Sequence, residues 1–336
     1  MKGPHAKAIQ AALVVYLISV SLAFTSPQTV LREQSSKEAQ QSARQDTSGE
    51  PRVINVTVTN KQGEFVIDLK QSDFNIFENK VPQPIVSFSR ADEPLSVGLL
   101  IDASASMWVQ QRNPQQTSVF IREALAKFFA LNNRSNDYFV IGFNKEPELL
   151  LDWTTDTQAV LRELGAIQPK GQTAFFDACY LGIDKVIHGR HSKRVIILVS
   201  DGIDTVSHYT SGEVRRLLRE SNVMVYSINA FGFGAAGTSL GPEGENILNE
   251  LSSISGGMAF SRKERVRLDA SQLGAVFELI AEELKRQYSI GFLPAASAGD
   301  KSWHRIKVKL TAPPDSAKEM KHLSVRTRDG YYAGSN

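Results

Sequence analysis

Asp102, Ser104 and Ser106 form an Asp-x-Ser-x-Ser pattern at the end of an apolar run that begins at Leu95. Such a run is typical of a strand that is buried on both faces of a parallel sheet. Open α/β sheets bind ligands at the carboxyl edge, where such a strand ends. One carboxylate and two hydroxyls are hard oxygen donors of the kind that Mg²⁺, Mn²⁺ and Ca²⁺ prefer. The pattern indicates a divalent metal site, and a capped strand-to-helix turn is the alternative interpretation.

Two later segments supply oxygen donors that could reach the same edge. Thr173 precedes a helical pattern, and Asp201 lies in a Ser-Asp-Gly sequence after a second apolar strand that begins at Val195. The five residues, their order along the chain and their places at strand ends or in loops therefore fit a single site. Together they resemble the metal-ion-dependent adhesion site of the von Willebrand factor A (VWFA) family. Two small departures are Ala105 and Gln172, which stand where that family often has glycine.

The resemblance implies roles for these five residues. Ser104, Ser106 and Thr173 would coordinate the ion directly or nearly so. Asp102 and Asp201 would bind it mostly through water, and an Asp or Glu of a protein partner would complete the octahedron. Neutral hydroxyl donors leave the ion much of its positive charge, so an anionic ligand is favoured.

Residues 94 to 286 alternate strand patterns with amphipathic helices. This order predicts an α/β domain with a doubly wound, mostly parallel sheet, as in the VWFA family, which resembles a Rossmann fold. Residues 148 to 153 should form an antiparallel edge strand, because the turn before them is too short for a helical crossover. Other strands are expected at 138–143, 223–230 and 258–261, and helices at 119–131, 157–167, 174–188, 212–220, 247–255 and 273–286.

The flanking residues 52–93 and 287–333 show short strand patterns separated by Pro, Asn, Asp and Gly. The expected strands include residues 53–58, 64–69, 74–79 and 84–90 before the α/β domain, and 287–293, 305–311 and 323–332 after it. Each flank alone has too few strands to cover a hydrophobic face. We therefore expect one small β-sandwich, built from both flanks, into which the α/β domain is inserted. The flanks also resemble an exported bacterial VWFA-related family.

The N-terminal 26 residues have an apolar run, Ile9 to Phe24, after Lys2 and Lys7. The run is short for a membrane span and has the form of a secretory signal, with an uncleaved anchor as the alternative. Residues 27–51 are polar and predict a disordered linker. The protein should therefore be exported, to the periplasm, the cell envelope or the medium, and should meet a membrane only through such an anchor.

The 336 residues carry a formal net charge of +2, with the basic residues dispersed, so a nucleic-acid partner is not expected. The single cysteine, Cys179, excludes an internal disulfide, and its surroundings predict a buried structural thiol. Gly232, Gly234 and Gly237 match a dinucleotide-binding pattern. The residues after them continue to break a helix, so a loop is expected there and no organic cofactor.

Catalysis would require a side chain that acts as a general base, and the loop histidine His208 is the candidate for that role. An exposed loop histidine is the simpler interpretation. Asp204 could be an outer-sphere carboxylate of the ion or a loop cap. The sequence predicts a metal-dependent protein-binding or adhesion module of the bacterial cell envelope, without enzymatic activity. The alternatives are an envelope scaffold with a vestigial metal site and, less favoured, a Mg²⁺-dependent hydrolase that uses His208.

Overall fold

The computed structural model describes residues 51–90, 92–104, 114–167, 170–229, 242–260, 270–295, 300–311, 320 and 322–333. These residues all belong to one compact unit, residues 47–336. Ser106, the proposed signal or anchor, the linker up to residue 50 and the 232–237 glycine motif lie outside the described residues. No helix in the described part of the chain combines the length and apolar character that crossing a membrane requires.

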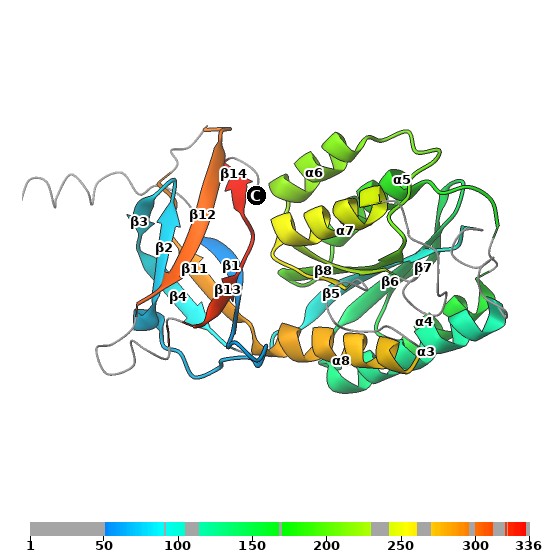
Figure 1. The fold of residues 1–336 in the computed structure, drawn as a ribbon, viewed down its shortest axis with the longest axis horizontal. Coiled ribbons are helices and arrows are strands. Elements are labelled where there is room, and N and C mark those ends of the chain that lie inside the picture. Colours follow the sequence, from blue (N-terminus) through cyan, green and yellow to red (C-terminus); the bar gives the residue numbers. More distant parts are fainter. Residues whose placement is uncertain are drawn as a thin grey trace, which may run out of the picture. The chain divides into compact units, whose positions relative to one another are not determined.

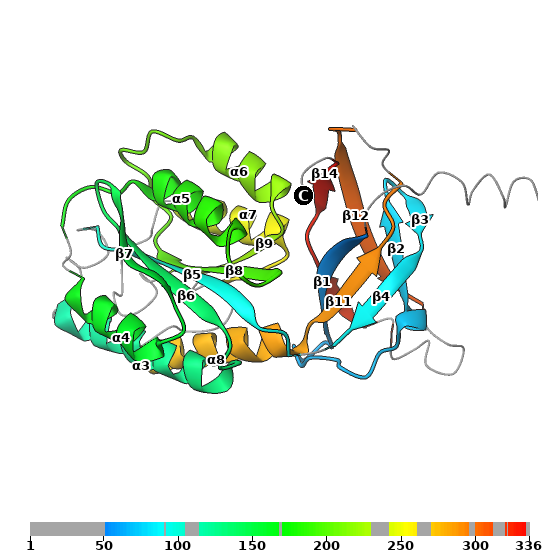
Figure 2. The same cartoon turned by 180° about the vertical axis from the view of Figure 1, so that it is seen from behind.

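A six-stranded sheet forms the centre of the α/β domain, with strand order β10-β9-β8-β5-β6-β7. All neighbours run parallel except β7, which pairs antiparallel with β6 at the edge, as expected (Figures 1 and 2). All eight residues of β5 are buried, which explains its near-continuous apolar sequence. The strands are β5 (Leu95–Asp102), β6 (Asp137–Phe143), β7 (Pro147–Thr154), β8 (Lys193–Ser200), β9 (Val223–Asn229) and β10 (Ala259–Phe260).

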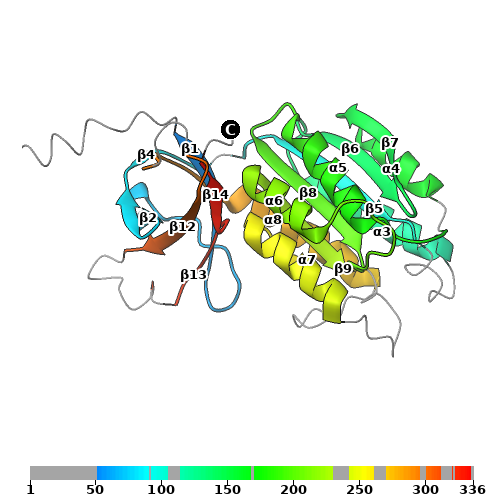
Figure 3. The same cartoon turned by 90° about the horizontal axis from the view of Figure 1, so that it is seen from above.

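Helices cover both faces of this sheet. One face packs against α3 (Pro114–Leu131), α4 (Thr157–Ala166) and α8 (Ala270–Arg286), and the other against α5 (Phe175–Ile187), α6 (Ser211–Glu220) and α7 (Pro242–Ser255). Figure 3 shows α5, α6 and α7 on their common face of the sheet. Alternate side chains of the buried strands enter the two separate cores, so the predicted doubly wound fold is confirmed.

The residues on either side of the α/β domain form two four-stranded sheets, with orders β13-β1-β11-β4 and β14-β12-β2-β3. Each sheet combines strands from both flanks, and one hydrophobic core lies between them. The predicted sandwich is therefore present. Its strands are β1 (Arg52–Thr59), β2 (Phe74–Glu78), β3 (Val81–Gln83), β4 (Ile85–Ser89), β11 (Tyr288–Phe292), β12 (Trp303–Leu310), β13 (Ser324–Arg326) and β14 (Gly330–Tyr332), with a short 3-10 helix, η1, at Gln71–Asp73.

The α/β domain enters and leaves the sandwich through neighbouring strands. β4 pairs antiparallel with β11, and Ser89 lies opposite Ser289. Only Gln287 separates the end of α8 from the start of β11. The chain therefore leaves one strand, builds the whole α/β domain, and returns in the adjacent strand.

One predicted strand, residues 64–69, is wrong. Phe65 makes an isolated bridge to Thr59, and the chain then leaves the sheet. The hydroxyl of Tyr288 replaces a neighbouring strand here: it donates to the Val66 carbonyl at 3.0 Å and accepts from the Leu69 amide at 3.1 Å. A side-chain partner far away in the sequence thus satisfies backbone groups that the apolar pattern assigns to a ladder.

Candidate functional site

Asp102 is the last residue of β5, and none of its surface is exposed. One carboxylate oxygen accepts a hydrogen bond from the Ser104 amide at 2.8 Å. The other accepts from the hydroxyl of Ser200, the last residue of the adjacent strand β8, at 2.6 Å. These bonds fix the carboxylate between two parallel strand ends. Ser200 was not assigned a role from the sequence, although it directly precedes Asp201.

Asp201 follows β8 directly and is likewise fully buried. Its carboxylate accepts from the Ile203 amide at 2.8 Å, which closes a tight turn around Gly202. Burial, and after it the negative charge of Asp201, raise the pKa of Asp102 from 3.8 to about 7, against the opposing effect of the hydrogen bonds from Ser104 and Ser200. The two carboxylates are therefore close enough to repel each other when both are ionised.

Gly202 allows the start of α7 to pack against this turn. Its φ of +76° is in the left-handed region, and a Cβ at this position would lie 2.4 Å from the Gly244 carbonyl oxygen. A Cβ on Gly244 would in turn lie 2.4 Å from the Asp201 carbonyl oxygen. Two glycines therefore meet where the Ser-Asp-Gly turn contacts α7, and neither position accommodates a side chain without movement.

Thr173 lies just before α5 and is 3% exposed. Its amide donates to the Thr205 hydroxyl at 2.8 Å, and its carbonyl accepts from the Thr205 amide at 2.8 Å. The preceding loop is joined to the β5 end, because the Lys170 amide donates to the Ala103 carbonyl at 2.9 Å. The structure thus brings the Thr173 loop, the end of β5 and the loop after β8 together at one edge of the sheet.

Four of the five residues that sequence analysis selected, namely Asp102, Ser104, Thr173 and Asp201, are described, and all four are buried at this carboxyl edge. Their donors are carboxylate and hydroxyl oxygens, which suit Mg²⁺, Mn²⁺ or Ca²⁺. In the described ranges no group of three or more His, Cys, Asp or Glu side chains could hold a metal. An ion at this edge would therefore depend on hydroxyl oxygens as well as on the two carboxylates.

Asp204 caps the N-terminus of α5, where its carboxylate accepts from the Phe175 amide at 2.9 Å. This favours the capping interpretation of the two that the sequence left open. Asp177 on α5 makes a reciprocal contact, since it accepts from the amides of His208 and Tyr209, each at 2.8 Å. The role of Asp177 was not predictable from the sequence, because nothing near it in the chain indicates a partner 31 residues away.

His208 extends into solvent, with 93% of its side-chain surface exposed. Its ring nitrogen Nδ1 lies 2.9 Å from the Asp177 carboxylate, which orients the imidazole. Cys179, by contrast, is buried in the core under α5, and burial raises the pKa of its thiol. The prediction of a buried structural thiol is confirmed.

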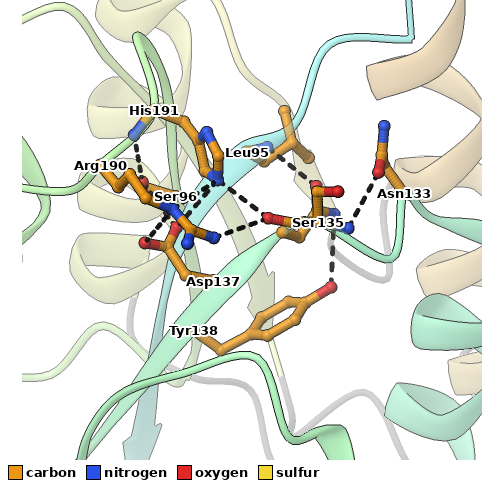
Figure 4. A network of polar contacts seen from close by, with 9 residues as sticks. Leu95, Ser96, Asn133, Ser135, Asp137, Tyr138, Arg190 and His191 are labelled. Atoms are coloured by element: carbon orange, nitrogen blue, oxygen red, sulfur yellow. Dashed lines mark hydrogen bonds and ion pairs between the residues drawn. The ribbon is translucent and has the colours of Figure 1, made fainter.

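Ser96, Asp137 and His191 lie together at the edge of the sheet where β5 and β6 begin, opposite to the candidate metal site (Figure 4). Their residue types are those of a hydrolytic triad, but their hydrogen bonds are not. The Ser96 hydroxyl donates to Asp137 at 2.7 Å and accepts from the His191 backbone amide at 2.9 Å. The His191 ring lies 2.9 Å from the Ser135 carbonyl oxygen. This network joins strand starts to the loop after α5, and the buried Ser96 hydroxyl does not contact the imidazole as a nucleophile would.

Comparisons with known proteins give one family match and a set of similar solved structures. Residues 97–203 match the model of the von Willebrand factor type A domain family. No curated protein matches the sequence. Similar solved structures include an aerotolerance-related membrane protein from Bacteroides fragilis, with 18% identity, a TM-score of 0.44, and coverage of 56% of this chain and 98% of that chain.

A von Willebrand factor type A protein from Catenulispora acidiphila has 11% identity and a TM-score of 0.45, covering 80% of this chain and 71% of that one. Proximal thread matrix protein 1 from the mussel byssus, with a zinc-occupied MIDAS motif, has 16% identity and a TM-score of 0.44, covering 62% and 49%. The segment that matches the family model, residues 97–203, runs from β5 to just beyond Asp201 and so includes the strand ends that carry both carboxylates. With its sheet order, this match identifies the α/β part of the chain as a von Willebrand factor type A domain.

Proposed function

We propose that Asp102, Ser104, Ser106, Thr173 and Asp201 hold a divalent cation, Mg²⁺ or Mn²⁺ or else Ca²⁺, and that the domain uses it to bind an acidic side chain of a protein partner. The supporting observation is the convergence of two fully buried carboxylates with Ser104 and Thr173 at one sheet edge. Ser106 joins the set on the sequence pattern alone.

The bound ion would supply an electrophilic centre that binds a carboxylate. The protein holds the donors in place before binding: Ser200 and the Ser104 amide fix Asp102, and the Ile203 amide fixes Asp201. Thr173 is fixed by paired hydrogen bonds to Thr205. Preorganised donors reduce the entropy lost when a ligand is captured.

The proposal is a binding module and not an enzyme. A hydrolase would need a base that reaches a substrate at the ion. His208 is the candidate from the sequence. It lies in the loop that follows Asp201, and its exposed ring is held by the Asp177 carboxylate. Because residues 1–26 have the form of a signal or anchor, we place the module in the bacterial cell envelope or outside the cell. A scaffold with a vestigial metal site is the alternative.

Thermal melts with and without divalent ions test the metal site. A ligand at a hundred times its Kd stabilises the folded state by about 2.7 kcal/mol. For a domain of this size, that shift corresponds to a gain of roughly 5–10 °C in Tm. Wild type should gain stability with Mg²⁺ or Mn²⁺, and Asp201→Ala should not. Asp184→Asn removes an exposed carboxylate from α5 and serves as the matched control.

The same variants test the partner. Binding of an envelope protein should require the ion, fail in EDTA, disappear in Asp201→Ala and persist in Asp184→Asn. Free acetate at high concentration should compete weakly, because it offers the same carboxylate. A wild-type melt that ignores divalent ions, or undiminished binding by Asp201→Ala, would favour the scaffold. Turnover that is lost in His208→Ala would favour the hydrolase.

A further inference from the structure

Tyr180 on α5 and Tyr209 in the loop after β8 stack face to face, with ring centroids 3.8 Å apart and planes at 3°. Tyr209 remains 39% exposed although one face of its ring is covered by Tyr180. We propose that this tyrosine pair is a specificity surface for the partner: it binds an aromatic side chain of the segment whose acidic residue binds the ion. This inference rests on the proposed function.

Both tyrosines belong to segments that start at the candidate site. Tyr180 lies in the second turn of α5, which begins directly after the Thr173 loop. Tyr209 ends the loop that starts at Asp201, and that loop is bonded to Thr173 through the Thr205 and Val206 amides. Along the α5 axis, Tyr180 is about 7–8 Å from the start of the helix. An extended segment of about three residues covers roughly 10 Å, which spans this axial offset.

Hydrogen bonds hold the Tyr209 loop in place before any partner binds. The amides of His208 and Tyr209 both donate to the Asp177 carboxylate at 2.8 Å. The Asp177 amide donates to the Ser207 hydroxyl at 3.1 Å, so α5 and the loop are joined in both directions. On the far side, Thr210 caps α6. A rigid aromatic surface loses little conformational entropy on binding, which is why tyrosine is frequent at binding hot spots.

The chemistry of the pair indicates what it binds. Aromatic rings prefer offset-stacked or edge-to-face neighbours, so an exposed tyrosine stack is suited to a third ring. His208 is next to Tyr209 and offers its exposed imidazole, oriented by Asp177, as an additional polar contact. The expected partner is therefore a protein segment with an Asp or Glu and an aromatic residue about two to four positions away.

A displayed peptide library with a fixed Asp and random flanking positions tests the inference, selected on the full chain in Mn²⁺ and in EDTA. Wild type should enrich aromatic residues about two to four positions from the Asp, and only in Mn²⁺. Tyr209→Ala should lose that enrichment and bind the best peptide at least about tenfold more weakly. Its melt should still rise with Mn²⁺, as in wild type, because the metal ligands are intact.

Two variants control for folding and for general loss of apolar surface. Tyr209→Phe keeps the ring and should bind the best peptide within about threefold of wild type. Leu181→Ala removes an exposed apolar side chain, 37% exposed, from a different face of the same helix and should behave as wild type. Peptide binding equal to wild type in Tyr209→Ala would overturn the inference, as would loss of binding in Leu181→Ala equal to that in Tyr209→Ala.

The outcomes separate this inference from the proposed function. Metal-dependent peptides without an aromatic preference refute the tyrosine surface and leave the metal site standing. A wild-type protein that melts higher with Mn²⁺ but selects no peptide also refutes the tyrosine surface. A wild-type protein with neither a metal-dependent melt nor a metal-dependent peptide refutes the proposed function and this inference together.

Discussion

The guanidinium of Arg326 on β13 lies 2.6 Å from the Glu283 carboxylate on α8. Glu283 is 1% exposed and also accepts hydrogen bonds from the hydroxyls of Tyr226, at 2.7 Å, and Thr57, at 3.1 Å. The buried carboxylate therefore joins α8, the last helix of the α/β domain, to two strands of the sandwich. Its contribution to stability depends on keeping every partner in place.

Arg326→Met should destabilise the protein by about 3 kcal/mol or more, because it leaves Glu283 as an uncompensated buried charge. Glu283→Leu should cost less, since the Arg326 side chain is 24% exposed and can reach water. Urea unfolding of the two single variants and the double variant measures the coupling. The double variant should lose less than the sum of the single losses; additive losses would show that the two side chains are not coupled.

Lys193 gives the stability a dependence on alkaline pH. Burial lowers its pKa from 10.5 to about 8, and nearby carboxylates, Glu93 foremost, oppose the shift. Between these values the unfolded chain binds more protons than the folded one, so stability should rise with pH, by at most about 1.4 kcal/mol per unit. Lys193→Met should remove this rise. Urea midpoints between pH 7 and pH 10 measure the difference, and parallel pH profiles would contradict it.

Asp102→Asn should stabilise the protein in EDTA. The pKa of Asp102 is raised from 3.8 to about 7, by burial and then by Asp201, so ionising this residue weakens the fold as pH rises between those values. The advantage of the variant should be absent near pH 4 and reach on the order of 1–3 kcal/mol above pH 7. Melts across this range in EDTA measure it. A variant less stable than wild type at pH 8 would mean that the hydrogen bonds to Asp102 outweigh its desolvation.

Gly202→Ala should destabilise the site turn by at least about 2 kcal/mol, because it combines a left-handed φ with a backbone contact. Gly244→Ala meets the same contact from the other side without a left-handed φ and should cost less. Urea unfolding compares the two, and metal-dependent melts report on the site. Equal losses would assign the whole effect to the close approach of the two backbones.

Much of the architecture was predictable because it follows from local patterns. Buried parallel strands such as β5 and β8 have apolar sequences that end abruptly, so Asp102 and Asp201 could be placed at strand ends before any coordinates. The antiparallel β7 followed from the short turn before it. The pattern of five candidate metal-binding residues then predicted the edge of the sheet at which those that the structure describes are found.

The parts that were not predictable depend on side chains that are distant in sequence. The Tyr288 hydroxyl, in place of a neighbouring strand, bonds to the backbone of residues 66–69, and Asp177 holds the loop that follows β8. The strand β3 was missed because it has three residues and contains Pro82, which weakens any strand pattern. Neither the stacking of Tyr180 on Tyr209 nor the ion pair of Arg326 has a local signature.

The insertion between β4 and β11 has a mechanical consequence. A pull applied at β1 and β14 would be carried by the hydrogen bonds between β1 and β13 and by the short chain segment that joins β13 to β14, as long as β1 and β13 stay paired. The A domain leaves and re-enters through two adjacent strands, held together by their own ladder from Ser89 and Ser289 onwards. It therefore lies in a closed loop outside the line of tension, and the edge that carries Asp102 and Asp201 would keep its geometry while the sandwich bears the load.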